Sequence, residues 1–249
     1  KEMHKEIRKL VVDAAFHAKH GHIPSALSIT DILVALDKVK TTKDEFILSK
    51  GHGCLAYYAY LACKNKIEKS ELRSFGKKGS RLGGHPDKNK IDDIYASTGS
   101  LGHGLPIAVG VALARKIMNQ PGTVYCLIGD GESNEGTIWE SIMIAEKHKL
   151  NNLICIVDNN RSQTRSLPTT NLYEKFFSFG WNVSIVDGHD INILEKNLNP
   201  YGLMQPRVVI ANTIKGKGVK DIEDNMFAWH HRAPNEEEYK KFVKEIDEA

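Results

Sequence analysis

The apolar residues in the middle of the chain fall into two short runs with a helical pattern between them. Residues 124–128 and 153–157 are almost wholly apolar, which is typical of strands buried on both faces of a parallel sheet. Between the runs, Ile138, Ile142 and Ala145 recur at helical spacing. The order predicts a strand-helix-strand unit, whose crossover brings the carboxyl ends of both strands to one edge of the sheet.

The same two periodicities recur along the rest of the chain. The apolar spacing over residues 2–20 predicts a helix, either Ser28 or Thr30 can cap the next one, and Asn235 can cap a last helix. We find no internal repeat or linker, so residues 1–249 are expected to form one α/β domain, with a doubly wound, mainly parallel sheet flanked by helices and a C-terminal helical extension. Further helices are expected at 54–63, 105–114, 138–148 and 191–198, further strands at 46–49, 181–186 and 207–212, and a loop at 21–25.

Polar residues follow both strands of the central unit. Asp130 lies between Gly129 and Gly131 after the first strand, and Asn159 and Asn160 end the second. Carboxylate and amide oxygens suit Mg²⁺, which keeps phosphate oxygens and water as its remaining ligands. The glycines permit close approach to the backbone, and the next helix directs its N-terminal amides at an anion. This pattern predicts a site for a Mg²⁺-bound diphosphate, whereas the alternative is a pair of ordinary surface turns.

Several histidines lie in loops that glycine or proline stiffens. His22 lies between Gly21 and Pro24, His52 lies between two glycines at a strand-to-helix turn, and His85 belongs to a Gly-His-Pro turn. Histidine can give and take protons near neutral pH, so several such loops at one sheet edge favour proton transfer. A single loop histidine is more often a surface residue, and that alternative stays open for each of them.

A glycine-rich loop at 97–104 leads into a nearly wholly apolar helix. A helix that is apolar all round belongs in an interior or at a subunit interface. The loop itself can be interpreted either as part of a ligand site or as a simple helix N-cap, in which Thr98 or Ser100 caps the helix without any ligand.

Composition limits the function without assigning it. The net charge of +3 is small and indicates no nucleic-acid or membrane partner, and no apolar run approaches the roughly 20 residues that span a bilayer. The chain has 4 cysteines without CxxC spacing; Cys126 and Cys155 lie in predicted strands, so we expect reduced core thiols in a cytoplasmic protein. Because Lys1 is not an initiator methionine, we expect residues to precede it in the natural chain.

A series of short motifs extends over nearly the whole chain. Their types and their order resemble those in the N-terminal half of a transketolase, of the kind in which that half is encoded as a separate subunit. The resemblance implies the thiamine diphosphate-binding fold (PP domain) and transfer of a two-carbon ketol unit from a ketose or ketose phosphate donor to an aldose acceptor. The matching motifs are GH at 21–22, LSKGHG at 48–53, GGHPD at 83–87, STGSLGHG at 97–104, GDGESNEG at 129–136, VDNN at 157–160, DGHD at 187–190, KGKGV at 215–219 and WHHRAP at 229–234.

The resemblance also implies a metal and cofactor site. Mg²⁺, or Ca²⁺ or Mn²⁺ in its place, would be bound by the side chains of Asp130 and Asn160 and the backbone carbonyl of Ser162. The amide of Gly131 would contact the diphosphate of thiamine diphosphate. The remaining cofactor contacts implied are His52, His230, Gly99, Leu101 and Glu135, of which Gly99 and Leu101 match backbone that holds the aminopyrimidine ring and Glu135 matches an acidic residue at the subunit interface.

The resemblance implies catalytic roles for His22, His85 and His230, which match residues that contact the sugar or the cofactor or assist proton transfer. We interpret the other loop histidines, His103, His189 and His231, as structural. The chain departs from the family pattern at Ser162 and near Thr164, where relatives often carry apolar residues. A backbone carbonyl binds metal whatever its side chain, so this departure favours a specialised relative that acts on an unusual sugar.

In this family a glutamate on a separate pyrimidine-binding domain activates the cofactor, and we expect that this chain lacks the length for that domain. The resemblance therefore implies a companion C-terminal subunit, with two copies of each chain, and an isolated chain without activity. The alternatives are another thiamine diphosphate enzyme subunit, such as a deoxyxylulose-phosphate synthase or a 2-oxoacid dehydrogenase component, and a non-catalytic binding subunit. The GHPD and WHHRAP motifs favour transketolase, and intact Asp130 and Asn160 disfavour a relic site.

Overall fold

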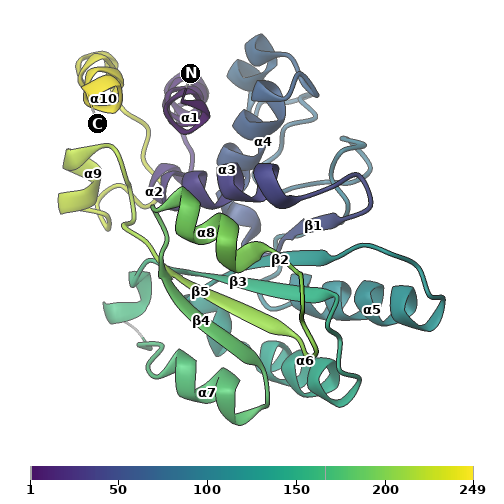
Figure 1. Ribbon diagram of the computed structural model, residues 1–249. Helices are drawn as coiled ribbons and strands as arrows, with labels where there is room; N and C mark the ends of the chain where they lie inside the picture. Colours follow the sequence, from purple (N-terminus) through teal and green to yellow (C-terminus); the bar gives the residue numbers. More distant parts are fainter. Residues whose placement is uncertain (1, 166, 249) are drawn as a thin grey trace.

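A parallel sheet forms the centre of the molecule (Figure 1). The computed structural model describes residues 2–165 and 167–248, and within them the sheet has five strands in the order β1-β2-β3-β5-β4. Every neighbouring pair is parallel, as expected for a sheet built from crossover units. The strands are β1 (Glu45–Leu48), β2 (Val124–Gly129), β3 (Leu153–Asn159), β4 (Asn182–Asp187) and β5 (Arg207–Asn212).

Helices cover both faces of this sheet, which confirms the doubly wound α/β prediction (Figure 1). One face carries α5 (Gly104–Ile117), α6 (Gly136–Lys147) and α7 (Leu172–Ser178). The other face carries α3 (Thr30–Val39) and α8 (Ile191–Leu198), with α1 (Met3–Ala18), α2 (Ile23–Ser28) and α4 (Cys54–Cys63) beyond them, and α9 (Lys220–Asp224) and α10 (Glu236–Glu248) follow β5. Short 3₁₀ turns occupy Gly51–Gly53, Lys69–Ser74, Gly131–Asn134 and Ser162–Arg165.

Successive residues of the central strands enter the two cores alternately. In β2, Tyr125 and Leu127 belong to one core, whereas Val124, Cys126 and Ile128 belong to the other. Cys126 and Cys155 are register partners, fully buried and unpaired as thiols, which confirms the expected core cysteines. The strands are therefore buried on both faces, as their continuous apolar runs predict.

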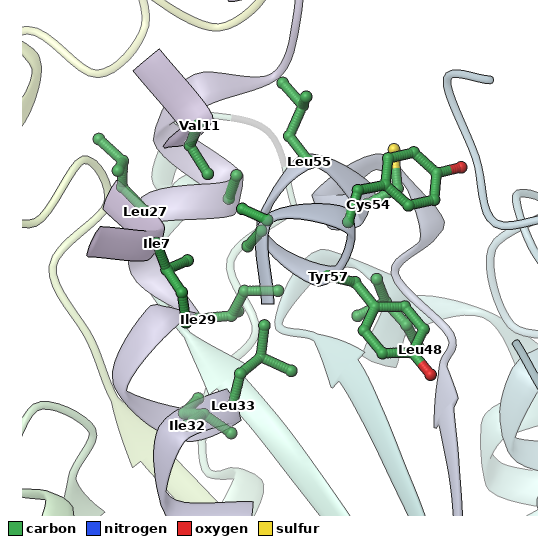
Figure 2. Close-up of a cluster of buried hydrophobic side chains, with 14 of the residues drawn as sticks. Ile7, Val11, Leu27, Ile29, Ile32, Leu33, Leu48, Cys54, Leu55 and Tyr57 are labelled. Carbon is green, nitrogen blue, oxygen red and sulfur yellow. The ribbon is translucent and has the colours of Figure 1, made fainter. Parts of the chain in front are cut away.

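The larger core lies among α1, α2, α3, α4 and β1. Figure 2 shows Ile7 and Val11 of α1 beside Leu27 of α2 and Leu33 of α3, with Leu55 of α4 facing them. Each of these side chains is at most 2% exposed. This packing holds the N-terminal helices against the sheet, and the C-terminal α10 completes it through contacts with α1.

Several local predictions need correction. The first helix ends at Ala18, because Lys19 adopts the left-handed conformation with φ 63°. The proposed caps Ser28 and Thr30 are wrong: the Ser28 hydroxyl donates to Asp158 at 2.7 Å and the Thr30 hydroxyl donates to Ala26 O at 3.3 Å. The Asn235 cap is confirmed, since its side-chain oxygen accepts from Glu238 N at 2.9 Å.

The segment predicted as a loop at 21–25 begins α2 at Ile23. Pro24 is compatible with this helix because a proline in the first turn has no intrahelical hydrogen bond to lose. No helix in residues 2–165 or 167–248 is long and apolar enough to cross a membrane.

Candidate active site

The two strand tips that carry Asp130 and Asn160 meet at one point. β2 and β3 are in register up to Gly129 and Asp158, and Asp130 N donates to Asp158 O at 3.1 Å. Ser162 joins the two tips, because its hydroxyl donates to Asp130 Oδ1 at 3.1 Å and its amide donates to Asn160 Oδ1 at 3.1 Å. The predicted convergence of one carboxylate, one amide and Ser162 is therefore present in the structure.

A buried carboxylate, Asp158, organises the residues beneath this point. It accepts hydrogen bonds from Ser28 Oγ at 2.7 Å, Asn160 Nδ2 at 2.8 Å, Thr213 Oγ1 and Lys50 Nζ. Burial alone would raise the pKa of Asp158, but the Lys50 ammonium and these donors hold it below its ordinary value. Since the amide nitrogen of Asn160 is bound to Asp158, its amide oxygen faces the opposite way, toward Ser162.

Sequence reasoning missed the pair of Lys50 and Asp158. Both residues are 0% exposed, yet they are separated by 108 positions. The available signal was their place in the chain, since Asp158 ends an apolar run and Lys50 directly follows a short buried strand. Charged residues at such places need partners.

A second buried carboxylate, Glu132, ties three loops together. It accepts from Gly102 N at 2.8 Å, from Gly129 N at 3.1 Å and from the Ser49 hydroxyl. Ser49 Oγ in turn accepts from Gly104 N at 3.1 Å. Burial raises the pKa of Glu132. The glycine-rich loop at 97–104 is thereby fixed to the ends of β1 and β2.

The simple-cap interpretation of that loop is wrong. Thr98 Oγ1 donates to Leu48 O at 2.6 Å, and neither Thr98 nor Ser100 is the residue before α5, which is His103. The loop instead approaches the turn after β1 closely, because a Cβ on Gly51 would lie 3.0 Å from Gly99 N. Gly51 is therefore required where two backbones meet.

All of the predicted site residues line one cavity of about 530 Å³ above the strand tips. The sequence separates them widely, and the carboxyl edge of the sheet brings them together. They are His22, His52, His85, Gly99, Leu101, Asp130, Gly131, Glu135, Asn160, Ser162 and His230; Lys50, Gly129, Glu132, Asn134, Gln163, Leu167 and Lys215 complete the lining. The side chain of Thr164 lies outside the described part of the chain.

The histidines form a cluster around His22. Its ring centroid lies 5.5 Å from that of His52, 5.3 Å from that of His230 and 4.6 Å from that of His231. Burial, reinforced by neighbouring positive groups, lowers the pKa of His22 to about 4 and that of His52 to about 2. Both imidazoles are therefore neutral at pH 7. His231, interpreted from the sequence as structural, packs against His22 but does not line the cavity.

Lys215 is a further functional candidate that sequence reasoning missed. It follows β5, is 6% exposed and lines the cavity. Among residues 2–165 and 167–248 its ammonium has no ion-pair partner, and burial lowers its pKa to about 8. The KGKGV motif contains two lysines, and only the fold determines which of them faces the cavity.

This arrangement can bind an anion beside a hard cation. Asp130 and Asn160 offer oxygen ligands, and burial together with the nearby Asp158 carboxylate raises the pKa of Asp130. A bound cation would reverse that shift. Lys215 and the neutral ring N–H groups of His52 and His230 supply donors on another wall of the cavity.

Comparisons with known proteins agree with this geometry. The family described as transketolase, thiamine diphosphate binding domain, matches residues 1–246. An apulose-4-phosphate transketolase subunit from Phocaeicola vulgatus is 36% identical, over 97% of this chain and 91% of that protein. The 6-deoxy-6-sulfo-D-fructose transketolase subunit SqwG of a Clostridium species is 36% identical, over 97% of this chain and 94% of that protein.

Solved structures give the same result. The transketolase of Campylobacter jejuni superposes on 99% of this chain with a TM-score of 0.90 and 28% sequence identity. This chain spans 42% of the length of that transketolase. The chain therefore belongs to the transketolase family, as a thiamine diphosphate-binding domain.

Proposed function

We propose that the chain is the N-terminal, cofactor-binding subunit of a two-chain transketolase, which transfers a two-carbon ketol unit from a ketose phosphate donor to an aldose acceptor. The proposal rests on one observation: Asp130 and Asn160 meet through Ser162 inside a cavity that four histidines line. Two relatives of nearly the same length are named as transketolase subunits, which supports the two-chain assignment.

The metal in this proposal is Mg²⁺, with Ca²⁺ or Mn²⁺ able to replace it. The side-chain oxygens of Asp130 and Asn160 and the backbone carbonyl of Ser162 would bind it, with diphosphate oxygens and water as the other ligands. The fit rests on the Asn160 amide, whose orientation is fixed by Asp158. Within residues 2–165 and 167–248 no group of three or more His, Cys, Asp or Glu side chains could hold a metal, so the proposed oxygen set depends on the diphosphate.

The diphosphate would lie between this metal and Lys215. Lys215 supplies a positive charge, whereas the neutral rings of His52 and His230 supply N–H donors. The amide of Gly131 donates to Asp130 Oδ1 at 2.8 Å, and it would contact the diphosphate by exchanging or sharing that acceptor. A Cβ on Gly131 would lie 2.3 Å from Gln163 Nε2, so the absence of a side chain lets the Gln163 amide cover this backbone. Gln163 is therefore a further donor in the proposal.

When bound, thiamine diphosphate supplies the carbanion for ketol transfer. The backbone of Gly99 and Leu101 would hold the aminopyrimidine ring, while His22 and His85 would contact the sugar. A neutral His22 ring can accept the proton of a sugar hydroxyl at its free nitrogen and return it later. Its position beside His52 and His230 restricts where that hydroxyl can lie.

The companion chain in this proposal covers the exposed side of α5 and α6. Leu105 and Ala108 of α5 are fully buried on the sheet, whereas Ile107 is 40% exposed, and Met143 and Ile144 of α6 are 48% and 46% exposed. Large exposed apolar side chains on helices that pack together indicate a protein interface. Two copies of each chain would form the assembly, with the companion contributing the glutamate that activates the cofactor.

The substrate class proposed is a ketose with a terminal anionic group, and the departure at Ser162 favours a specialised sugar. The names of the two relatives contain a sugar phosphate and a sulfonated sugar, which supports this class. These relatives do not favour the other thiamine diphosphate enzyme types or a non-catalytic role. The proposal places the enzyme in the cytoplasm, where reduced thiols such as those of Cys126 and Cys155 persist.

Mixing tests the proposed activity. The chain combined with a companion that carries the pyrimidine-binding domain should transfer ketol units, and a panel of ketose donors should rank a specialised sugar above xylulose 5-phosphate. Robust transfer by this chain alone would refute the two-chain proposal, a preference for xylulose 5-phosphate would refute the specialised substrate, and turnover of pyruvate would refute the reaction class.

Asp130→Ala tests the metal assignment. We expect calorimetry with the companion present to detect no binding of thiamine diphosphate plus Mg²⁺, because the proposed metal loses its carboxylate ligand, while circular dichroism stays unchanged. Asp92→Ala removes an exposed carboxylate outside the cavity and should bind as the wild type does. Equal binding by both variants would contradict the assignment.

A further inference from the structure

The loop that carries Lys215 is held on both sides of that residue by side chains from distant segments. Ile214 N donates to His189 Nε2 at 2.8 Å, and Lys217 O accepts from Arg8 Nε at 3.0 Å. The Lys215 ammonium contributes nothing to this attachment, because within the described ranges it has no ion-pair partner. Its position in the cavity is therefore set through the backbone on either side, where Gly216 N also donates to Pro24 O at 3.1 Å.

The two attachments are connected to each other. Asp31 Oδ2 accepts from Arg8 Nη2 and lies 2.7 Å from His189 Nδ1. The side chains of Arg8 and Asp31 are only 6% and 5% exposed, and that of His189 is 11% exposed. Burial alone would raise the pKa of Asp31, but the His189 hydrogen bond and the Arg8 charge hold it below its ordinary value. Asp31 is thus an ionised link between Arg8 and His189.

The hydrogen bonds fix the tautomer of His189. The backbone N–H of Ile214 can only donate, so Nε2 must accept. Nδ1 therefore carries the proton and donates to Asp31. Because both ring nitrogens are occupied, His189 has none left for substrate or diphosphate, and its effect on the cavity must act through Ile214.

We propose that Arg8, Asp31 and His189 form a positioning relay that fixes the 214–217 loop so that the Lys215 ammonium lies in the cavity where an anionic diphosphate binds. The relay rests on the proposed function for the identity of that anion. A buried lysine without a partner gains little from its own contacts, so the loop needs this external support. The relay residues are positioning residues and do not touch the cofactor.

Two amide substitutions separate the two contacts of His189. His189→Asn keeps a donor near the Nδ1 position for Asp31 and loses the acceptor for Ile214, whereas His189→Gln keeps an acceptor near the Nε2 position and loses the Asp31 contact. We expect His189→Asn to weaken binding of thiamine diphosphate plus Mg²⁺ by about three- to tenfold, the effect of one lost hydrogen bond. His189→Gln keeps the contact with Ile214 but loses its link to Asp31, so it should weaken binding by a smaller factor than His189→Asn does, between that variant and the wild type.

A Lys215→Met background tests whether the effect passes through Lys215. In that background His189→Asn should weaken binding no further, because the group that it positions is gone. Hydrogen exchange of the Ile214 amide, measured without cofactor, should accelerate strongly in His189→Asn and more weakly in His189→Gln. This readout does not require a functional enzyme.

The outcomes separate the relay from the proposed function. A wild-type chain that binds no thiamine diphosphate with its companion present refutes the function, whereas the exchange measurement still tests the loop attachment. Additive effects of His189→Asn and Lys215→Met, binding by His189→Gln equal either to that of the wild type or to that of His189→Asn, or unchanged exchange at Ile214 would overturn the relay.

Discussion

Replacing Asp158 with asparagine should destabilise the fold severely, because it leaves the Lys50 ammonium buried without a counter-charge. Lys50 is 0% exposed and lies beneath the strand tips, so water cannot replace the lost partner. Removing one member of a buried ion pair costs about 3–5 kcal/mol. That is a large part of the roughly 5–15 kcal/mol by which a typical domain is stable. Asp158→Asn and Lys50→Met should each show this loss in urea unfolding.

The double variant Lys50→Met/Asp158→Asn provides the refutation. With both charges removed no unpaired charge remains, so the double variant should lose less than the sum of the single losses, by about 1–3 kcal/mol. If the double variant instead lost as much stability as the two single variants together, Lys50 and Asp158 would not stabilise each other. Glu236→Gln removes an exposed partner of Lys240 and should leave the urea midpoint unchanged.

Two further predictions concern His22 and the glycines of α5. The pKa of His22 is lowered from its ordinary 6.5 to about 4 in the folded chain. Between pH 4 and 6.5 the unfolded chain therefore binds more protons than the folded chain, and the free energy of unfolding decreases as the pH falls from 6.5 toward 4. This decrease should stay below about 1.4 kcal/mol per pH unit, since the ring is partly solvated. Thermal unfolding of His22→Gln should depend less on pH than that of the wild type, and an unchanged dependence of the melting temperature on pH would contradict this. Gly104→Ala should cost about 1–3 kcal/mol in urea unfolding, because a Cβ would lie 2.3 Å from Ser49 Oγ and 2.6 Å from its Cα. Gly110→Ala in the same helix meets nothing within 4 Å and should stabilise by about 0.5–1 kcal/mol; equal effects at both glycines would refute the steric argument.

The sequence alone was sufficient for the strands and for the sheet edge where the site lies. Continuous apolar runs such as 153–157 can be recognised from neighbours in the sequence, and the crossover rule then places Asp130 and Asn160 together. The helix at Ile23–Ser28 was missed because glycine and proline around it also favour a loop. Proline in a first helical turn is compatible with both interpretations, and only packing decides between them.

The buried polar network could not be derived in the same way. Lys50 and Asp158 are separated by 108 positions, and Glu132 contacts Ser49 and Gly102, which precede it by 83 and 30 positions. Which charged side chain of a loop turns inward depends on partners that only the folded chain supplies. Lys215 and Lys217 illustrate this, since they occur in one motif and only Lys215 lines the site cavity.

The position of β5 between β3 and β4 affects how the chain can fold while it is being synthesised. A nascent chain that has emerged only as far as β4 has no β5 to pair with β3, so the long apolar edge of β3 stays open until Arg207–Asn212 leaves the ribosome. Lys215 and His230 follow later still, so the cavity lacks these two lining residues until the segment after β5 has appeared. Early release or truncation before β5 would therefore leave a fragment prone to aggregate, and not a smaller version of the same enzyme.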